Sequence, residues 1–163
     1  MKTKAHVTHR IQHLEILKET GRYSDLINGY REKVLTQQTR TIRLLGRKSS
    51  AKIIHTLLGF EVQASYKRIQ CPDLVTARYL RLFSELGCHS IKLPYDPTLT
   101  EQLIPGFEAT VDSIKERIRE IFPRDSSTQQ YVIRKIYDIV RRQLAASEFL
   151  RQPRAGPDFS PDA

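Results

Sequence analysis

Apolar residues recur every three or four positions over much of the chain, which is the spacing that places them on one face of an α-helix. Three helices are predicted in the N-terminal part. The first ends before Gly21 and carries a stripe of four apolar residues, Val7, Ile11, Leu14 and Leu17. The second is predicted over 24–45 and the third over 49–59, each with a serine at its start and a glycine after or at its end.

The pattern changes to an alternation of apolar and polar residues over 60–69, which predicts a β-strand. Pro72 and Asp73 then open a helix that runs to Leu86 and is ended by Gly87. A second short strand is predicted over 89–93. The order strand, helix, strand predicts a βαβ unit with parallel strands.

The C-terminal part returns to helical spacing. A capping-box pattern at Thr98 begins a helix that Pro105 and Gly106 are expected to interrupt, and a continuous apolar stripe follows to Ile121. Another capping box at Ser126 begins the last helix. These segments predict an antiparallel helical hairpin over 98–148.

The elements together predict a mainly helical α+β fold. We expect residues 1–150 to form a single globular domain, composed of a basic helical part over 1–58, an α/β centre over 60–96 and the helical hairpin. Residues 151–163 are rich in proline and lack periodicity, so a disordered tail is predicted there.

Composition is that of a globular protein, with 39% hydrophobic and 28% charged residues. No apolar run approaches the roughly 20 residues of a membrane helix, so no membrane partner is expected and a cytoplasmic location is predicted. Cys71 and Cys88 lie at the two ends of one predicted helix, too far apart to form a disulfide with each other.

The distribution of charge along the chain is more informative about function than the overall composition. The net charge is +9, and residues 1–60 hold 12 Lys and Arg against 4 Asp and Glu, whereas residues 101–163 hold 10 of each. The segment from Lys33 to Phe60 contains no acid. An anionic partner is therefore expected at the N-terminal part of the chain.

Phosphates are held by several fixed cations without competing carboxylates. Arg40, Arg43 and Arg47 recur at spacings of three and four residues, which would align them on one helical face, and Tyr66 could stack on a base beside them. The complete predicted nucleic-acid-binding set is Arg40, Arg43, Arg47, Lys48, Lys52, Lys67, Arg68, Arg78 and Arg81.

Arg78 and Arg81 also have a structural interpretation. Glu85 follows Arg81 by one helical turn, so a surface ion pair between them is the alternative to nucleic-acid contact. A winged helix-turn-helix is not predicted, because a single short strand follows this helix where a wing needs two.

Signals for catalysis or cofactors are weak. His6, His9 and His13 share a helical stripe, but no fourth ligand accompanies them at motif spacing, so no metal site is predicted. The segment from His89 to Asp96 could hold an active site, although it lacks a recognisable nucleophile and base. No cofactor or catalytic residue is predicted, and binding is favoured over catalysis.

The sequence thus favours a small cytoplasmic nucleic-acid-binding protein, regulatory or accessory in role, with DNA and RNA both open. The alternative is a protein-interaction or scaffolding module whose amphipathic helices bind an acidic protein or a second copy of the chain. A small enzyme acting through the His89–Asp96 segment is a third hypothesis.

Overall fold

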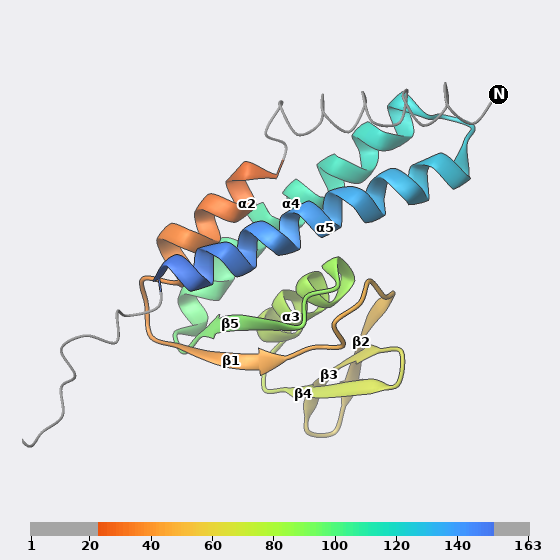
Figure 1. Cartoon of the computed structure of the whole chain (residues 1–163). Helices are drawn as coiled ribbons and strands as arrows, with labels where there is room; N and C mark the ends of the chain where they lie inside the picture. Colours follow the sequence, from red (N-terminus) through yellow and green to blue (C-terminus); the bar gives the residue numbers. More distant parts are fainter. Residues whose placement is uncertain (1–22, 152–163) are drawn as a thin grey trace, which may run out of the picture.

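The computed structural model describes residues 23–151, and more than half of these residues lie in helices (Figure 1). Helices α2 (Ser24–Gly29), α4 (Pro97–Ile121) and α5 (Ser126–Arg151) lie on one side of the molecule. The strands lie on the other side, and α3 (Leu74–Leu86) contacts both groups. The fold is therefore α+β, as the sequence predicts.

The helix predicted to run over 24–45 begins at Ser24 but ends much earlier. It continues from α2 into a π-helical turn, η1 (Tyr30–Val34), and the chain then enters strand β1 (Thr39–Arg43). β1 pairs antiparallel with β5 (Ser90–Pro94), with Ile42 opposite Ile91. The prediction of helix beyond residue 34 is wrong because β-branched residues in β1 find a strand partner far along the chain.

The helix predicted over 49–59 is also wrong, because this segment forms one half of a β-hairpin. Strand β2 (Ala51–Thr56) turns through Leu57 and Leu58 into β3 (Gly59–Ala64), with Thr56 opposite Gly59. Gly59 has a φ of +128°, and a side chain there would meet the carbonyl oxygen of Cys71 at 2.9 Å. Glycine is required at this position, and it begins a strand instead of ending a helix.

The strand predicted over 60–69 is two strands joined by a tight turn. β3 turns through Ser65 and Tyr66 into β4 (Lys67–Cys71), and Ser65 takes up a positive φ of 56°. Strands β2, β3 and β4 form one antiparallel sheet in that order, while β1 and β5 form another. The predicted parallel βαβ unit is therefore wrong, since the strands before and after α3 belong to different sheets.

The two ends of helix α3 are set by residues next to it in the sequence. The Asp73 side chain accepts a hydrogen bond from the backbone N–H of Thr76 at 2.7 Å, and Gly87 ends the helix in the left-handed conformation with a φ of +86°. Tyr79, Leu82 and Leu86, which follow one another at spacings of three and four residues, are buried. The strand predicted after this helix is confirmed as β5.

Helix α4 runs through Pro105 without a break, contrary to the predicted interruption. Pro105 has no N–H group, so the carbonyl of Glu101, four residues earlier, loses its helical hydrogen bond. Both residues are exposed, and water can satisfy that carbonyl. Buried Ile104 and Phe107 on the opposite side hold the helix together. A four-residue turn then leads to α5, which lies beside α4 and runs the other way (Figure 1).

The core is centred on an aromatic cluster that fixes the position of β5. The Tyr79 and Phe83 ring centroids are 4.8 Å apart, and Phe83 also contacts Tyr30 and Phe107. Tyr79 donates a hydrogen bond to the Lys92 carbonyl at 2.7 Å, while Tyr30 accepts one from the Lys92 N–H at 3.1 Å. Helices from two parts of the sequence, η1 and α3, thus hold the middle of β5.

The helix predicted before Gly21, the three histidines on it and residues 152–163 of the predicted tail lie outside the described residues. Arg151, where the tail was expected to begin, is the last residue of α5.

Candidate nucleic-acid interface

The outer face of the three-stranded sheet carries a row of polar side chains. Lys52 on β2, Gln63 on β3 and Arg68 on β4 lie directly opposite one another in the strand register. Neighbouring strands are about 4.8 Å apart, so the two cations are separated by about 10 Å across the sheet. The structure therefore brings together Lys52 and Arg68, which the sequence places on different predicted elements.

Strand alternation explains why this row faces outward. The next residues along the three strands, Ile53, Val62 and Ile69, also lie opposite one another, and they pack against the hydrophobic core. Side chains of successive strand residues point to opposite faces. The burial of this apolar row consequently turns the polar row toward solvent.

One acid lies on the same outer face. Glu61 accepts a hydrogen bond from the Gln63 amide at 3.0 Å, and its carboxylate lies 3.7 Å from the Arg68 guanidinium. The Arg68 side chain is 71% exposed, whereas that of Glu61 is 17% exposed, so the arginine remains accessible. Among residues 23–151, Lys52 forms no ion pair, and the row keeps a positive balance.

Tyr66 lies next to this row, at the turn between β3 and β4. Its side chain is 79% exposed, and only the Ala64–Lys67 pair separates the turn from Gln63 and Arg68. An exposed ring can stack on an unpaired base. We call Lys52, Gln63, Tyr66 and Arg68 the strand-face patch.

The remaining predicted N-terminal cations do not form the expected helical ridge. Arg40 lies opposite Leu93 and Arg43 opposite Ser90, so their side chains leave β1 on opposite faces, and Arg47 follows the turn at Gly46. All three are exposed, and none forms an ion pair within the described part of the chain. Lys67 likewise leaves β4 on the face opposite to Arg68.

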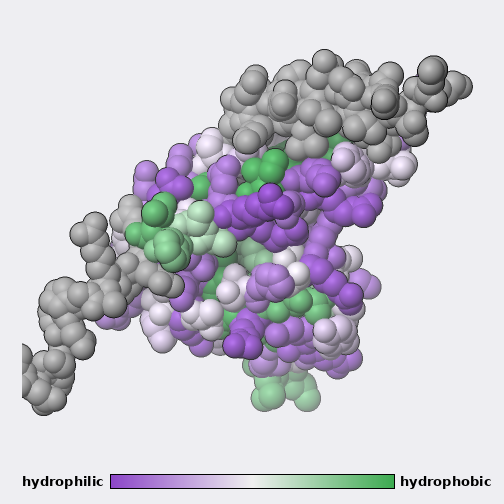
Figure 2. All heavy atoms as spheres, in the orientation of Figure 1, coloured by the Kyte–Doolittle hydropathy of each residue, from purple (hydrophilic) through white to green (hydrophobic). Residues whose placement is uncertain are grey.

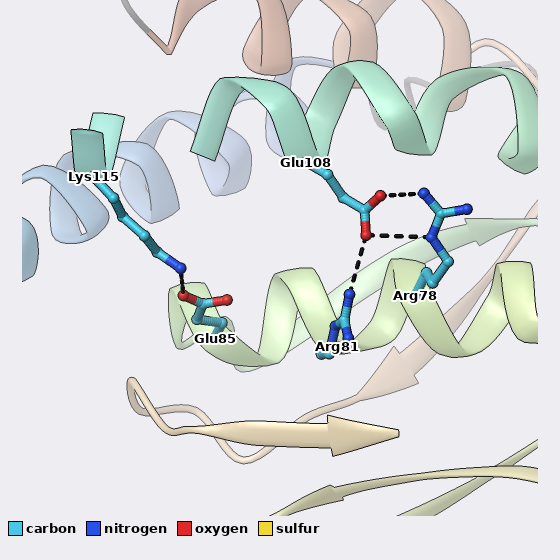
Figure 3. A network of polar contacts seen from close by, with 5 residues as sticks. All are labelled: Arg78, Arg81, Glu85, Glu108 and Lys115. Carbon is cyan, nitrogen blue, oxygen red and sulfur yellow. Dashed lines mark hydrogen bonds and ion pairs between the residues drawn. The ribbon is translucent and has the colours of Figure 1, made fainter. Parts of the chain in front are cut away.

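Arg78 and Arg81 have a different environment, which Figure 3 shows. Both guanidinium groups bind the carboxylate of Glu108 on α4, with Arg78 Nε donating over 3.3 Å and Arg81 Nη2 over 3.2 Å. Hydrogen bonding to Glu108 raises the pKa of Arg78. These two cations join α3 to α4 and share one counter-charge.

The predicted Arg81–Glu85 ion pair is wrong, because both residues find partners on α4 instead. Glu85 pairs with Lys115, while Arg81 pairs with Glu108 (Figure 3). Both residues thus form ion pairs between α3 and α4, in place of the predicted ion pair within α3.

Lys48 is half-buried against α5. Its ammonium group donates to the Gln130 side chain at 3.1 Å and lies 5.8 Å from the centre of the Tyr137 ring. Burial lowers the pKa of Lys48, and the nearby charge of Arg134 lowers it further. Lys48 is therefore separate from the strand-face patch.

The structure does not support one active site between His89 and Asp96. His89 precedes β5 and Asp96 follows it, so a strand of about 17 Å lies between them. Asp96 accepts a hydrogen bond from the Thr98 N–H at 2.9 Å and caps α4. Its role in this structure is that of a helix cap.

Both cysteines are buried, and they are free, in agreement with the prediction that they lie too far apart to form a disulfide with each other. Burial raises the pKa of the Cys71 thiol to about 11 and that of Cys88 to about 12. A thiol that is protonated at neutral pH is a poor nucleophile. Within residues 23–151, no three His, Cys, Asp or Glu side chains are grouped as metal ligands would be.

Gln63 is the member of the patch that the sequence analysis missed. The signal that could have found it is the Ser65–Tyr66 pair in the middle of an alternating segment, which is compatible with a two-residue hairpin turn. Placing the turn there fixes the strand register, and the register puts Gln63 opposite Arg68.

No protein family, curated protein or solved structure matches this chain. None of the helices within 23–151 combines the length and the apolar character needed to cross a bilayer.

Proposed function

We propose that the protein binds single-stranded nucleic acid through the strand-face patch. The observation that carries this proposal is the exposed Tyr66 ring beside Lys52 and Arg68 on an open sheet face. Stacking of bases on aromatic rings, combined with cations that follow the backbone, is the general mode of single-strand recognition. The ring would stack on one base while the two cations contact neighbouring phosphates.

Further cations would extend the contact to phosphates beyond the patch. Arg40, Arg43 and Arg47 are exposed and belong to the same acid-free segment as Lys52. Because their side chains leave the chain in different directions, they are better suited to a flexible single strand than to a straight duplex. RNA and DNA both carry the backbone and bases that this mode requires.

The proposal is tested by fluorescence anisotropy with labelled single-stranded RNA, single-stranded DNA and duplex DNA of the same length. We expect single strands to bind more tightly than duplex. We also expect the logarithm of the binding constant to fall with the logarithm of salt concentration, at a slope corresponding to about three to five phosphates.

Two variants with equal charge change make the test specific. Lys52→Glu with Arg68→Glu should weaken single-strand binding at least tenfold and lower the salt slope by about 1–2. Arg117→Glu with Arg142→Glu changes the net charge equally, at exposed or half-exposed positions on α4 and α5. Equal losses in the two variants, or no binding by the wild type at low salt, would overturn the proposal.

A protein-binding role is the second candidate, and one observation favours it. Leu57 and Leu58 at the β2–β3 turn are fully or largely exposed, and Figure 2 shows the apolar tip that they form. Adjacent exposed leucines are typical of contact surfaces. Replacing both by serine should leave nucleic-acid binding intact under our proposal and abolish capture of a partner under the alternative.

A further inference from the structure

A second cationic site lies among the helices, at the place where Lys48 packs. The segment after β1, the end of α3, α4 and the start of α5 enclose a cavity of about 270 Å³. Its polar lining consists of Lys48, Glu85, Lys115, Arg119, Gln129 and Gln130, with Ile133 and Tyr137 forming its apolar wall. We call this cavity the Lys48 pocket.

Helical spacing explains how the donors converge. Lys115 and Arg119 are four residues apart on α4, so they share a helix face, and Gln130 on α5 lines the same cavity. Lys48 reaches between the two helices and donates to Gln130 at 3.1 Å. Cationic side chains from two separate segments, Lys48 after β1 and Lys115 and Arg119 on α4, therefore meet around one small space.

The charges in this space do not balance. Glu85 is occupied by Lys115 and also accepts a hydrogen bond from the Tyr137 hydroxyl at 3.4 Å. Within residues 23–151, the structure shows no ion pair for Lys48, Arg119 or Arg134. Burial and the charge of Arg134 lower the pKa of Lys48, the Glu85 carboxylate raises it, and Lys115 lowers it again, as expected where several cations share one counter-charge.

A hydroxyl group in the adjoining space points to the same kind of ligand. Lys48 and Glu85 also line a neighbouring cavity of about 360 Å³, together with Ser49 and Ser50. The Ser49 hydroxyl is buried, and no partner for it is found among the described residues. A buried donor without an acceptor is unfavourable, and an oxyanion next to Lys48 would supply the acceptor.

We propose that the Lys48 pocket binds a phosphate group, held by Lys48 and Arg119 with the Gln130 amide as a further donor. A phosphate carries several acceptor oxygens and up to two negative charges, which suits a site with cationic donors and one carboxylate already paired. The group would be either free phosphate or the terminal phosphate of an oligonucleotide. This site is distinct from the strand-face patch, so the proposal does not rest on nucleic-acid binding.

The test is isothermal titration calorimetry of the full chain with inorganic phosphate and with pyrophosphate. The wild type should bind at least one of them, and Arg119→Gln should weaken that binding at least tenfold. Arg119 is exposed, so this variant is expected to fold. Lys48→Gln should have a similar effect, since it removes the central donor.

Arg117→Gln is the matched control, because Arg117 lies on the same helix but pairs with Glu120 at 3.0 Å. It should bind phosphate as the wild type does, and so should Lys52→Glu with Arg68→Glu. Absence of phosphate binding by the wild type at millimolar concentration would overturn the proposal. An equal loss in Arg117→Gln and Arg119→Gln would do so as well.

The source of the phosphate is decided by comparing oligonucleotides with and without a 5′-phosphate. A terminal phosphate bound in the pocket should strengthen binding to the wild type at least threefold and have no effect on Arg119→Gln. If the 5′-phosphate has no effect on either protein while inorganic phosphate still binds, the pocket takes free phosphate.

Discussion

Arg68 of the three-stranded sheet and the two arginines of helix α3 are alike in the sequence and different in the structure. Arg68 lies on an open sheet face with its side chain 71% exposed, while Arg78 and Arg81 share the carboxylate of Glu108. The first region can offer its charge to a ligand, whereas the second uses its charge to join two helices. A cation is therefore available for binding only where the fold leaves it without a strong partner.

The largest expected effect comes from the aromatic side chain of the sheet region. Tyr66→Ala should weaken single-strand binding by about 1–3 kcal/mol, since base stacking on a ring contributes about this much. The salt slope should not change, because no phosphate contact is lost. Anisotropy titrations at two salt concentrations measure both quantities, and a loss of slope without a loss of affinity would contradict the assignment of Tyr66.

The α3 region should respond in stability and leave binding unchanged. Glu108→Gln removes the charge shared by two arginines, whose side chains are 32% and 40% exposed. We expect the free energy of unfolding to fall by about 1–2 kcal/mol, a range that allows for solvent screening. Urea denaturation measures this change.

Glu108→Gln also tests, in the binding assay, whether helix α3 belongs to the nucleic-acid-binding surface. Freed from Glu108, Arg78 and Arg81 could attract nucleic acid, but they lie outside the strand-face patch. An affinity for single strands within twofold of the wild type is expected. A gain of tenfold or more would show that α3 belongs to the binding surface.

The two buried thiols make the core beneath both regions sensitive to alkaline pH. Cys71 ends β4 and Cys88 follows α3, and burial raises both pKa values from an ordinary 9.0, to about 11 and about 12. The unfolded chain releases these protons first. The stability that the protonated thiols contribute is therefore fully present below pH 9 and is lost as the pH rises toward 12.

Urea denaturation between pH 8 and pH 11 should show this decline in the wild type. The double variant Cys71→Ala, Cys88→Ala should show a shallower decline, even if it is less stable at pH 8. Identical pH profiles for the two proteins would contradict the burial of the thiols.

The smallest effect on stability is expected at the tip of the sheet region. Leu57→Ser with Leu58→Ser should change the free energy of unfolding by less than about 0.5 kcal/mol, because both side chains are exposed. Thermal unfolding measured by circular dichroism tests this. A large destabilisation would mean that the leucines pack against other parts of the protein.

Local signals predicted α3 correctly but failed for β1 and β2, which were predicted as helix. Asp73 and Gly87 mark the ends of α3 through contacts with neighbouring residues, so the sequence contains the information. The spacing of Ile53, Ile54, Leu57 and Leu58 is compatible with a helix, yet β2 forms because β3 pairs with it. Likewise β1 depends on β5, about 50 residues further along.

The candidate site was predictable in part for the same reason. Lys52, Tyr66 and Arg68 could be chosen from charge and residue type, but their meeting on one sheet face depends on register. The ion pairs of Arg78 and Arg81 depend on Glu108, which lies 30 and 27 residues further along the chain. No spacing rule within a helix connects residues so far apart.

The most direct test of the central claim is a titration of isotope-labelled protein with a short single-stranded oligonucleotide, followed by NMR. The account predicts that the backbone amide signals of Lys52, Gln63, Tyr66 and Arg68 shift, while those of Arg78 and Arg81 stay in place. Shifts concentrated on α3, with the β2–β4 sheet unchanged, would contradict it.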